Sequence, residues 1–323
     1  MLEVFSPGRR AGSLPIRRRS VVRAASLLLC LAFFGACQTS SDAKVVATQL
    51  AATATALSNY YAAIHTEILD IDQLNDLDQG VLGMPYDVQT RAGFMDNAAE
   101  IQKRADLAND ISTLAASLTQ LATSTGAADA TAAAGRLVSA AASIGPLGGS
   151  LPSSVPAGIV NGAQALFTAI QEHKIRAAAS GIAVCLHNFD KLFSAEEYIY
   201  ASFSGQYVDL SGQLSGWFVR NGQTDPAAYS SALAKMALSP YGLTAKIDAA
   251  TQAKIAATTQ MSIDQKSADM KAAQIEAGKA MEDALADIAT RAGDLAANKP
   301  LPTGITPPSL AIVNQWAATL AAK

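Results

Sequence analysis

The sequence has little of the chemistry on which most enzymes and metal proteins depend. Its 323 residues include three histidines, three cysteines and 6% aromatic residues, and charged residues make up only 16%. His65, His173 and His187 lie in no H-E-x-x-H or H-x-x-x-H spacing, so no zinc site of these kinds is indicated. No G-x-S-x-G turn, Walker loop or dinucleotide-binding fingerprint occurs. The sequence therefore identifies no catalytic residue, metal, cofactor or small-molecule substrate, and we expect the protein not to be an enzyme.

Positively charged residues are scarce after the first 36 positions. Six of the 24 basic residues precede Cys37, together with one of the 27 acidic residues. The remaining chain carries 18 basic and 26 acidic residues, a net charge of −8, and no run of lysine or arginine. Because binding to nucleic acid or to anionic lipid needs clustered cations, we expect neither as an electrostatic partner.

The apolar half of the sequence is rich in alanine, while β-branched and aromatic residues are scattered. Alanine favours helices, whereas strands need β-branched and aromatic residues. Apolar positions recur at spacings of three, four and seven over long stretches, which is typical of amphipathic helices. The sequence therefore predicts an all-α fold, an elongated antiparallel helical bundle with long coiled-coil-like helices.

The amino-terminal segment has the parts of an export signal. An arginine cluster precedes thirteen uncharged residues, Ala24 to Ala36, which end directly before Cys37. A basic start, a short apolar span and a small-residue end are typical of a secretory signal, and the span is too short for a comfortable membrane crossing. Phe34-Gly35-Ala36-Cys37 resembles the lipobox of bacterial lipoproteins, a resemblance that covers only the first forty residues.

The resemblance implies that residues 1–36 are a signal peptide and that Cys37 receives a diacylglycerol on its sulfur and, usually, an acyl chain such as palmitate on its new amino terminus. Residues 37–41 would then be a lipidated tether. Phe34 departs from the leucine that the family prefers, and the long amino-terminal region suggests an early start codon or a twin-arginine signal. An uncleaved anchor and an ordinary cut after Ala36 are the alternatives. Gln38, and not aspartate, follows the cysteine, which resembles the signal that sorts lipoproteins to the outer membrane in diderm bacteria. The expected location is therefore the outer membrane, facing the periplasm.

Cysteine usage agrees with export to an oxidising compartment. Cys30 would leave with the signal and Cys37 would carry lipid, so Cys185 stands alone and no intramolecular disulfide is expected. Its neighbours are apolar, which predicts a buried, unreactive thiol and not a nucleophile.

Two long helices are predicted in the first part of the bundle, which we place at residues 42–298. Apolar residues from Val46 to Ile68 form one helical face that ends within residues 70–80, with Pro85 in the connection. A second face runs from Phe94 to Leu121 and ends near Gly126. A short polar link between two long helices predicts an antiparallel hairpin.

The next region differs in composition, because residues 137–171 contain no charged side chain. Within it, residues 144–156 (IGPLGGSLPSSVP) hold three prolines and three glycines, which cannot sustain a helix. This break is the best candidate for a division between subdomains, and residues 157–170 recover helical potential. We interpret the region as a connection packed against other helices; the alternative is a membrane-inserting hairpin, as in helical pore-forming toxins.

The most aromatic stripe of the sequence predicts a central core helix that ends at Asn221-Gly222. Its members recur at helical spacing: Phe189, Phe193, Tyr200, Phe203, Tyr207, Leu210, Leu214 and Trp217. Residues 227–237 are predicted as a short helix and 240–242 as a turn. The longest uninterrupted helical pattern runs over 244–297, with heptad spacings that suit coiled-coil-like packing. Residues 299–323 form a Pro-rich loop and a short helix capped by Ser309.

Three groups that contain acidic residues are candidate sites, and we interpret all three as structural. Glu172-His173 and Glu196-Glu197 are adjacent pairs, whose side chains point about 100 degrees apart on a helix and do not converge. An acidic cluster lacks the ligand order of an EF-hand loop, so we interpret it as a solvated helix end and not a calcium site. Its members are Asp70, Asp72, Asp76 and Asp78.

Taken together, these features predict a lipid-anchored envelope protein with a structural or protein-interaction role, whose partners are the membrane, through its anchor, and other envelope proteins. The alternatives are a membrane-inserting protein that uses residues 137–171, and a ligand-binding or hydrolytic domain that uses the aromatic helix.

Overall fold

The computed structural model describes residues 16–81, 83, 87–122, 127–147, 154–171, 174–220, 249–301 and 309–321. These residues form seven helices and no strand, which confirms the all-α prediction: α1 (Ile16–Val81), α2 (Val88–Ala122), α3 (Ala127–Ala142), α4 (Ser154–Gln171), α5 (Ile175–Arg220), α7 (Ala249–Ala296) and α8 (Ser309–Ala321). The features predicted at 221–222, 227–237 and 240–242 lie outside the described residues.

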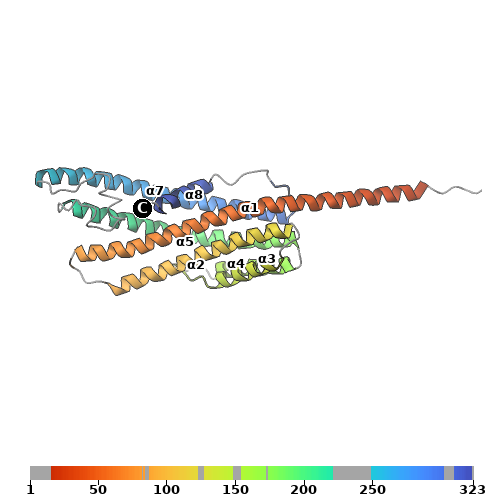
Figure 1. The fold of residues 1–323 in the computed structure, drawn as a ribbon, viewed down its shortest axis with the longest axis horizontal. Coiled ribbons are helices and arrows are strands. Elements are labelled where there is room, and N and C mark those ends of the chain that lie inside the picture. The colour runs from red at the N-terminus through yellow and green to blue at the C-terminus, as the bar shows by residue number, and fades with distance from the viewer. Residues whose placement is uncertain are drawn as a thin grey trace, which may run out of the picture.

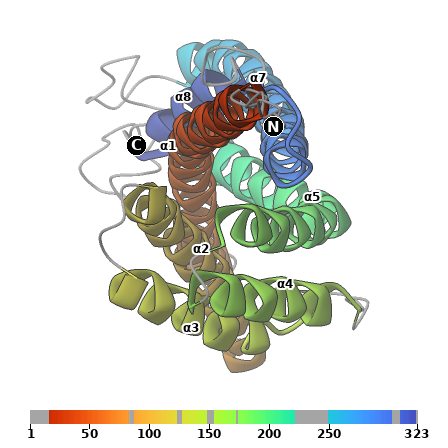
Figure 2. The same cartoon turned by 90° about the vertical axis from the view of Figure 1, so that its right-hand side faces the viewer.

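The helices form an antiparallel bundle. Successive helices run in opposite directions, and the first part of α1 extends beyond the end of the bundle (Figure 1). The predicted α1–α2 hairpin is confirmed, since these two helices pack along each other. In the end-on view, α3 and α4 lie beside α2 and α5, on the side away from α7 and α8 (Figure 2). The coiled-coil character expected of the long helices stays a prediction.

α1 is longer than its sequence pattern indicated, and with 66 residues it exceeds the 48 residues of α7. It passes through the acidic cluster to Val81, because Ile71 and Leu74 continue its buried face. Asp72 is itself buried, at 5% exposure, and the other three aspartates are half-buried, so the prediction of a solvated helix end is wrong. Gly83, with φ of 69°, donates its N–H to the Gly80 carbonyl oxygen (3.2 Å) after the helix ends. This left-handed conformation suits glycine, which has no Cβ to clash.

Aromatic side chains from three helices meet at the centre of the core. Phe193 and Tyr200 of α5 contact Tyr60 and Tyr61 of α1, with ring centroids 5.2 to 6.3 Å apart. Trp316 of α8 packs on Tyr60 with centroids 4.8 Å apart. The predicted central role of the aromatic helix is therefore confirmed, although Leu210 and Trp217 of the predicted stripe are only half-buried.

The uncharged region packs against other helices, as interpreted from the sequence. It holds the last turns of α3, a helix that packs on α2, and all of α4, which packs on α5. The core continues across the break through Ile144, Leu147 and Val155, so no division into subdomains is seen among the described residues. The prediction that residues 144–156 are non-helical is wrong at its end, because α4 begins at Ser154. Pro156 lies in the first helical turn, where its missing N–H has no helical partner to lose.

α4 approaches α5 closely through glycines. A Cβ added at Gly181 would lie 2.8 Å from the backbone nitrogen of Leu166, and one added at Gly162 would lie 2.8 Å from that of Cys185. Such distances leave no room for a side chain, so these glycines set the separation of the two helices. None of the described helices is both long enough and apolar enough to span a membrane.

α7 ends as predicted, just before Asn298. Asn298 adopts φ of 56° and donates its N–H to the Leu295 carbonyl oxygen (3.2 Å), while the Lys299 N–H donates to the Asp294 carbonyl oxygen (2.9 Å). This pair of bonds is a Schellman motif, with asparagine at the left-handed position. α8 then begins at Ser309 as predicted and buries Trp316 against α1.

Candidate functional site

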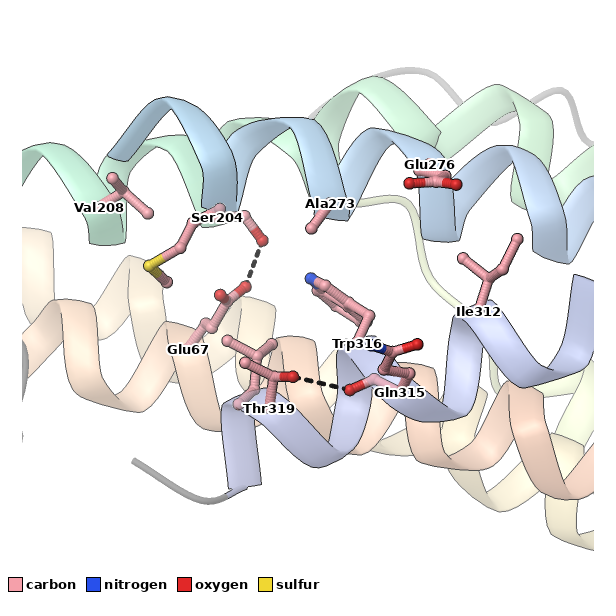
Figure 3. A pocket seen from close by; sticks show the side chains of 11 residues that line it. Glu67, Ser204, Val208, Ala273, Glu276, Ile312, Gln315, Trp316 and Thr319 are labelled. Carbon is pink, nitrogen blue, oxygen red and sulfur yellow. Dashed lines mark hydrogen bonds between the residues drawn. The ribbon is translucent and has the colours of Figure 1, made fainter. Parts of the chain in front are cut away.

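A cavity of about 200 Å³ lies where α1, α5, α7 and α8 meet. Glu67 of α1, Ser204 of α5 and Trp316 of α8 line its inner part and are 3%, 3% and 6% exposed. The Glu67 carboxylate and the indole nitrogen of Trp316 face the same space (Figure 3). The remaining lining residues are apolar walls or exposed polar residues at the mouth: Val208, Met270, Ala273, Ile312, Leu320, Glu276, Gln315 and Thr319.

Hydrogen bonds hold the inner side chains in place. The Ser204 hydroxyl of α5 donates to Oε2 of Glu67, which fixes the carboxylate across the α1–α5 interface (Figure 3). Behind the indole, Nε2 of Gln274 donates to the Tyr60 hydroxyl (3.0 Å). The cavity wall is therefore a preorganised polar arrangement within an apolar core.

The ionisable side chains that line the cavity are acidic. Burial raises the pKa of Tyr60 and Tyr207 far above the usual range, and the Glu67 charge adds to both shifts, so these phenols stay neutral. Glu67 and Glu276 are the ionisable groups among the described lining residues, and none of those residues is basic. The site can accept hydrogen bonds from a cation or a hydroxyl, and it repels anions.

A second buried polar group joins α2, α5 and the segment that follows α3. Arg104 is fully buried, and its guanidinium donates to both carboxylate oxygens of Glu196, with Nε to Oε2 at 2.7 Å. It also donates to the carbonyl oxygens of Glu100 (2.8 Å) and Gly145 (2.9 Å). The Tyr200 hydroxyl donates to Oε2 of Glu196 (2.6 Å). With its donors engaged inside the core, Arg104 is a structural residue.

Charges in this network shift two pKa values. Burial opposes the charge of Arg104, but the hydrogen bond and charge of Glu196 outweigh it and raise the Arg104 pKa. Burial also acts to raise the pKa of Glu100, and hydrogen bonds from Lys103 and the Gly145 N–H outweigh it, so the Glu100 pKa is lowered. Both groups are charged at neutral pH.

The predicted lipidation residue, Cys37, lies on α1, six positions before Ala43, the first buried residue that the structure describes. The helix runs without a break through the predicted tether, residues 37–41. Cys185 is buried, its thiol donates to the Ile159 carbonyl oxygen (3.4 Å), and burial raises its pKa to about 12. The prediction of a buried thiol is confirmed.

The histidines do not gather into a site. His65 is half-buried on α1, and His173 lies outside the described residues. His187 is exposed and lies with Asp190 in an open, shallow groove between α5 and α7. Burial, together with the Glu282 charge, raises the pKa of Asp190.

The acidic groups also stay apart. Asp72 lies 3.7 Å from Arg91 of α2, and among the described residues no three His, Cys, Asp or Glu side chains are arranged to hold a metal ion. Glu196 binds Arg104, whereas Glu197 faces Gly278 of α7. This adjacent pair does not converge, as predicted. The pair Glu172-His173 lies outside the described residues.

Sequence reasoning missed the buried ionisable residues, although their positions carried a signal. Arg104 lies three residues after Ile101 and seven before Ile111, on the buried face of α2. Glu196 lies three residues after Phe193 and four before Tyr200, inside the aromatic stripe. A charged residue in core register points to a buried partner.

Comparison with known proteins assigns no family, since no protein-family model, curated protein or solved structure matches the chain. The candidate site therefore rests on the geometry of its own residues.

Proposed function

We propose that this protein is a lipid-anchored helical protein of the bacterial cell envelope, with a structural or protein-interaction role. The position of Cys37 relative to the bundle supports this proposal. Ala43 lies six positions further along the helix, a rise of about 9 Å. Lipid at Cys37 would therefore hold one end of a packed bundle directly at a bilayer surface.

The direction of α1 then decides which end of the bundle faces away from the membrane. Residues 43–81 of α1 rise about 57 Å along the helix. α1 ends and α2 begins at the end of the bundle far from the start of α1, whereas α7 ends and α8 begins nearer that start (Figure 1). A bundle held in this way presents its long sides and its far end to partners in the periplasm, and the Gln38 sorting signal favours the outer membrane.

Mass spectrometry of the amino-terminal peptide from membrane-extracted protein tests the anchor. We expect residues 1–36 to be absent and Cys37 to carry diacylglycerol and acyl chains. Cys37→Ala should leave the chain uncleaved and free of lipid, while Cys185→Ala, the matched control, should be processed normally. A wild-type protein that retains Met1, or that carries no lipid on Cys37, would overturn the proposal.

Site-specific photo-crosslinking in cells tests the interaction role. Tyr198 of α5 and Ile275 of α7 are large apolar side chains that are 65% and 57% exposed. Cross-linkers at these positions should give a discrete adduct with an envelope component, and one at the exposed, charged Asp283 should not. A chain that stays monomeric and gives no adduct at either apolar position contradicts the role.

A further inference from the structure

We propose that the cavity lined by Glu67, Ser204 and Trp316 binds a small organic amine, a protonated amino group on an apolar body of about the size of one aromatic ring. This inference goes beyond lipid anchoring and does not depend on it, because the cavity is built from the folded part of the chain alone.

The volume of the cavity sets the size of the ligand. An apolar cavity of about 150 Å³ holds a benzene molecule. The cavity here measures about 200 Å³, which leaves room for a ring and a short polar arm. Val208, Met270 and Ile312 supply apolar and polarisable walls for the ring.

The two carboxyl groups of the cavity set the sign of the ligand. Glu67 is held by the Ser204 hydroxyl at the inner end, and the exposed Glu276 lies at the mouth. Charge interactions strengthen where water is excluded, so an ammonium group that reaches Glu67 gains more than it would at the surface. An anion would meet two carboxyl groups, and a neutral hydroxyl could donate a hydrogen bond to Glu67 but would gain no charge attraction.

The arrangement of the inner wall gives the ligand a defined orientation. The carboxylate of Glu67 and the indole nitrogen of Trp316 face one space from α1 and α8, two helices far apart in the sequence (Figure 3). Tyr60 packs against the indole and fixes it. The amino group therefore enters toward Glu67, with its apolar body between the indole and α7.

Calorimetric titration of the full chain with benzylamine, and with benzyl alcohol as its neutral counterpart of equal size, tests the proposal. We expect benzylamine to bind saturably and at least ten times more tightly than benzyl alcohol. In a Trp217→Phe background, Trp316 is the only tryptophan, since the sequence contains two, and its fluorescence should change on the same titration curve.

Three variants locate the binding. Glu67→Gln keeps the shape of the side chain and should weaken benzylamine at least tenfold, with little effect on benzyl alcohol. Glu276→Gln, at an exposed position that does not endanger folding, should weaken benzylamine two- to fivefold. Asp283→Asn, an exposed acid on the same helix outside the cavity, should change nothing.

The proposal is overturned if benzylamine does not bind, if benzyl alcohol binds as tightly, or if a folded Glu67→Gln chain keeps full affinity. Circular dichroism of each variant establishes folding, and where Glu67→Gln fails to fold, the comparison of Glu276→Gln with Asp283→Asn decides the question. None of these readouts depends on lipid at Cys37, so failure here leaves the anchoring proposal standing.

Discussion

The buried ion pair of Arg104 and Glu196 yields a double-mutant cycle with a large expected coupling. Both side chains are almost fully enclosed, at 0% and 3% exposure. Removal of one partner leaves the other charge buried without a counter-ion, which costs about 3–5 kcal/mol. We therefore expect Arg104→Met and Glu196→Leu each to lower the free energy of unfolding by about 3–5 kcal/mol.

The double variant removes both charges and also takes hydrogen bonds from neighbouring groups. Glu100 loses the bonds from Arg104 but keeps those from Lys103 and the Gly145 N–H. The Tyr200 hydroxyl loses its acceptor on Glu196, and the Gly145 carbonyl loses a donor on Arg104. An unsatisfied buried group costs about 1–3 kcal/mol, whereas exchanging a buried ion pair for apolar side chains is neutral or stabilises by about 1–4 kcal/mol. Because these effects offset each other, the double variant should lie within about 2 kcal/mol of the wild type, a coupling of at least about 4 kcal/mol.

Urea unfolding followed by far-UV circular dichroism measures the four free energies. The exposed pair of Lys271 and Asp209, 2.8 Å apart, is the matched control. Solvent screens this pair, so its own cycle should give a coupling below about 1 kcal/mol. If the two buried substitutions prove additive, with the double variant losing the sum of the single losses, the reasoning is refuted.

Three further predictions concern packing, thiol chemistry and pH. Gly181→Ala should destabilise the fold by about 1–3 kcal/mol in urea unfolding, because the new Cβ meets the α4 backbone at 2.8 Å. The control Gly135→Ala, whose new Cβ meets nothing within 4 Å, should stabilise the fold by about 0.5–1 kcal/mol. Equal effects of the two substitutions would argue against the close α4–α5 contact. The Cys185 thiol, whose pKa burial raises to about 12, should react with a disulfide reagent at mildly alkaline pH only when the chain unfolds; reaction of the folded chain at the rate of an exposed thiol is the contrary result. Glu282→Gln should stabilise the fold by about 0.5 kcal/mol at neutral pH. Burial, and after it the Glu282 charge, raises the pKa of Asp190 and of Glu197, both on α5. A raised carboxyl pKa destabilises the fold above that pKa and has no effect below the unfolded value near 4, so the gain should vanish in acid, and a pH-independent gain would speak against it.

Local patterns were sufficient for most helices, because burial on one face imposes a spacing that can be read within a few turns. The apolar positions of α1 from Val46 to Ile68 are buried as predicted, and α7 and α8 end and begin at their predicted signals. α3 was not predicted, because its sixteen residues are mostly small and include only Leu137 and Val138 as large apolar side chains, too few to show a helical spacing. The predicted end of the first helix within residues 70–80 is wrong, because Ile71 and Leu74 continue the buried face of α1 between the acidic residues.

The sequence by itself determined that the chain is helical and where most of its helices lie, since these properties depend on residues within one or two turns of each other. Only the tertiary structure decided that Glu67 meets Ser204 across 137 residues and that Trp316 lines a cavity with both of them. Only the tertiary structure, likewise, decided that Arg104 meets Glu196 across 92 residues. The physical reason is that helical periodicity specifies which face of a helix is buried, whereas the choice of partner depends on how side chains from distant helices fit together.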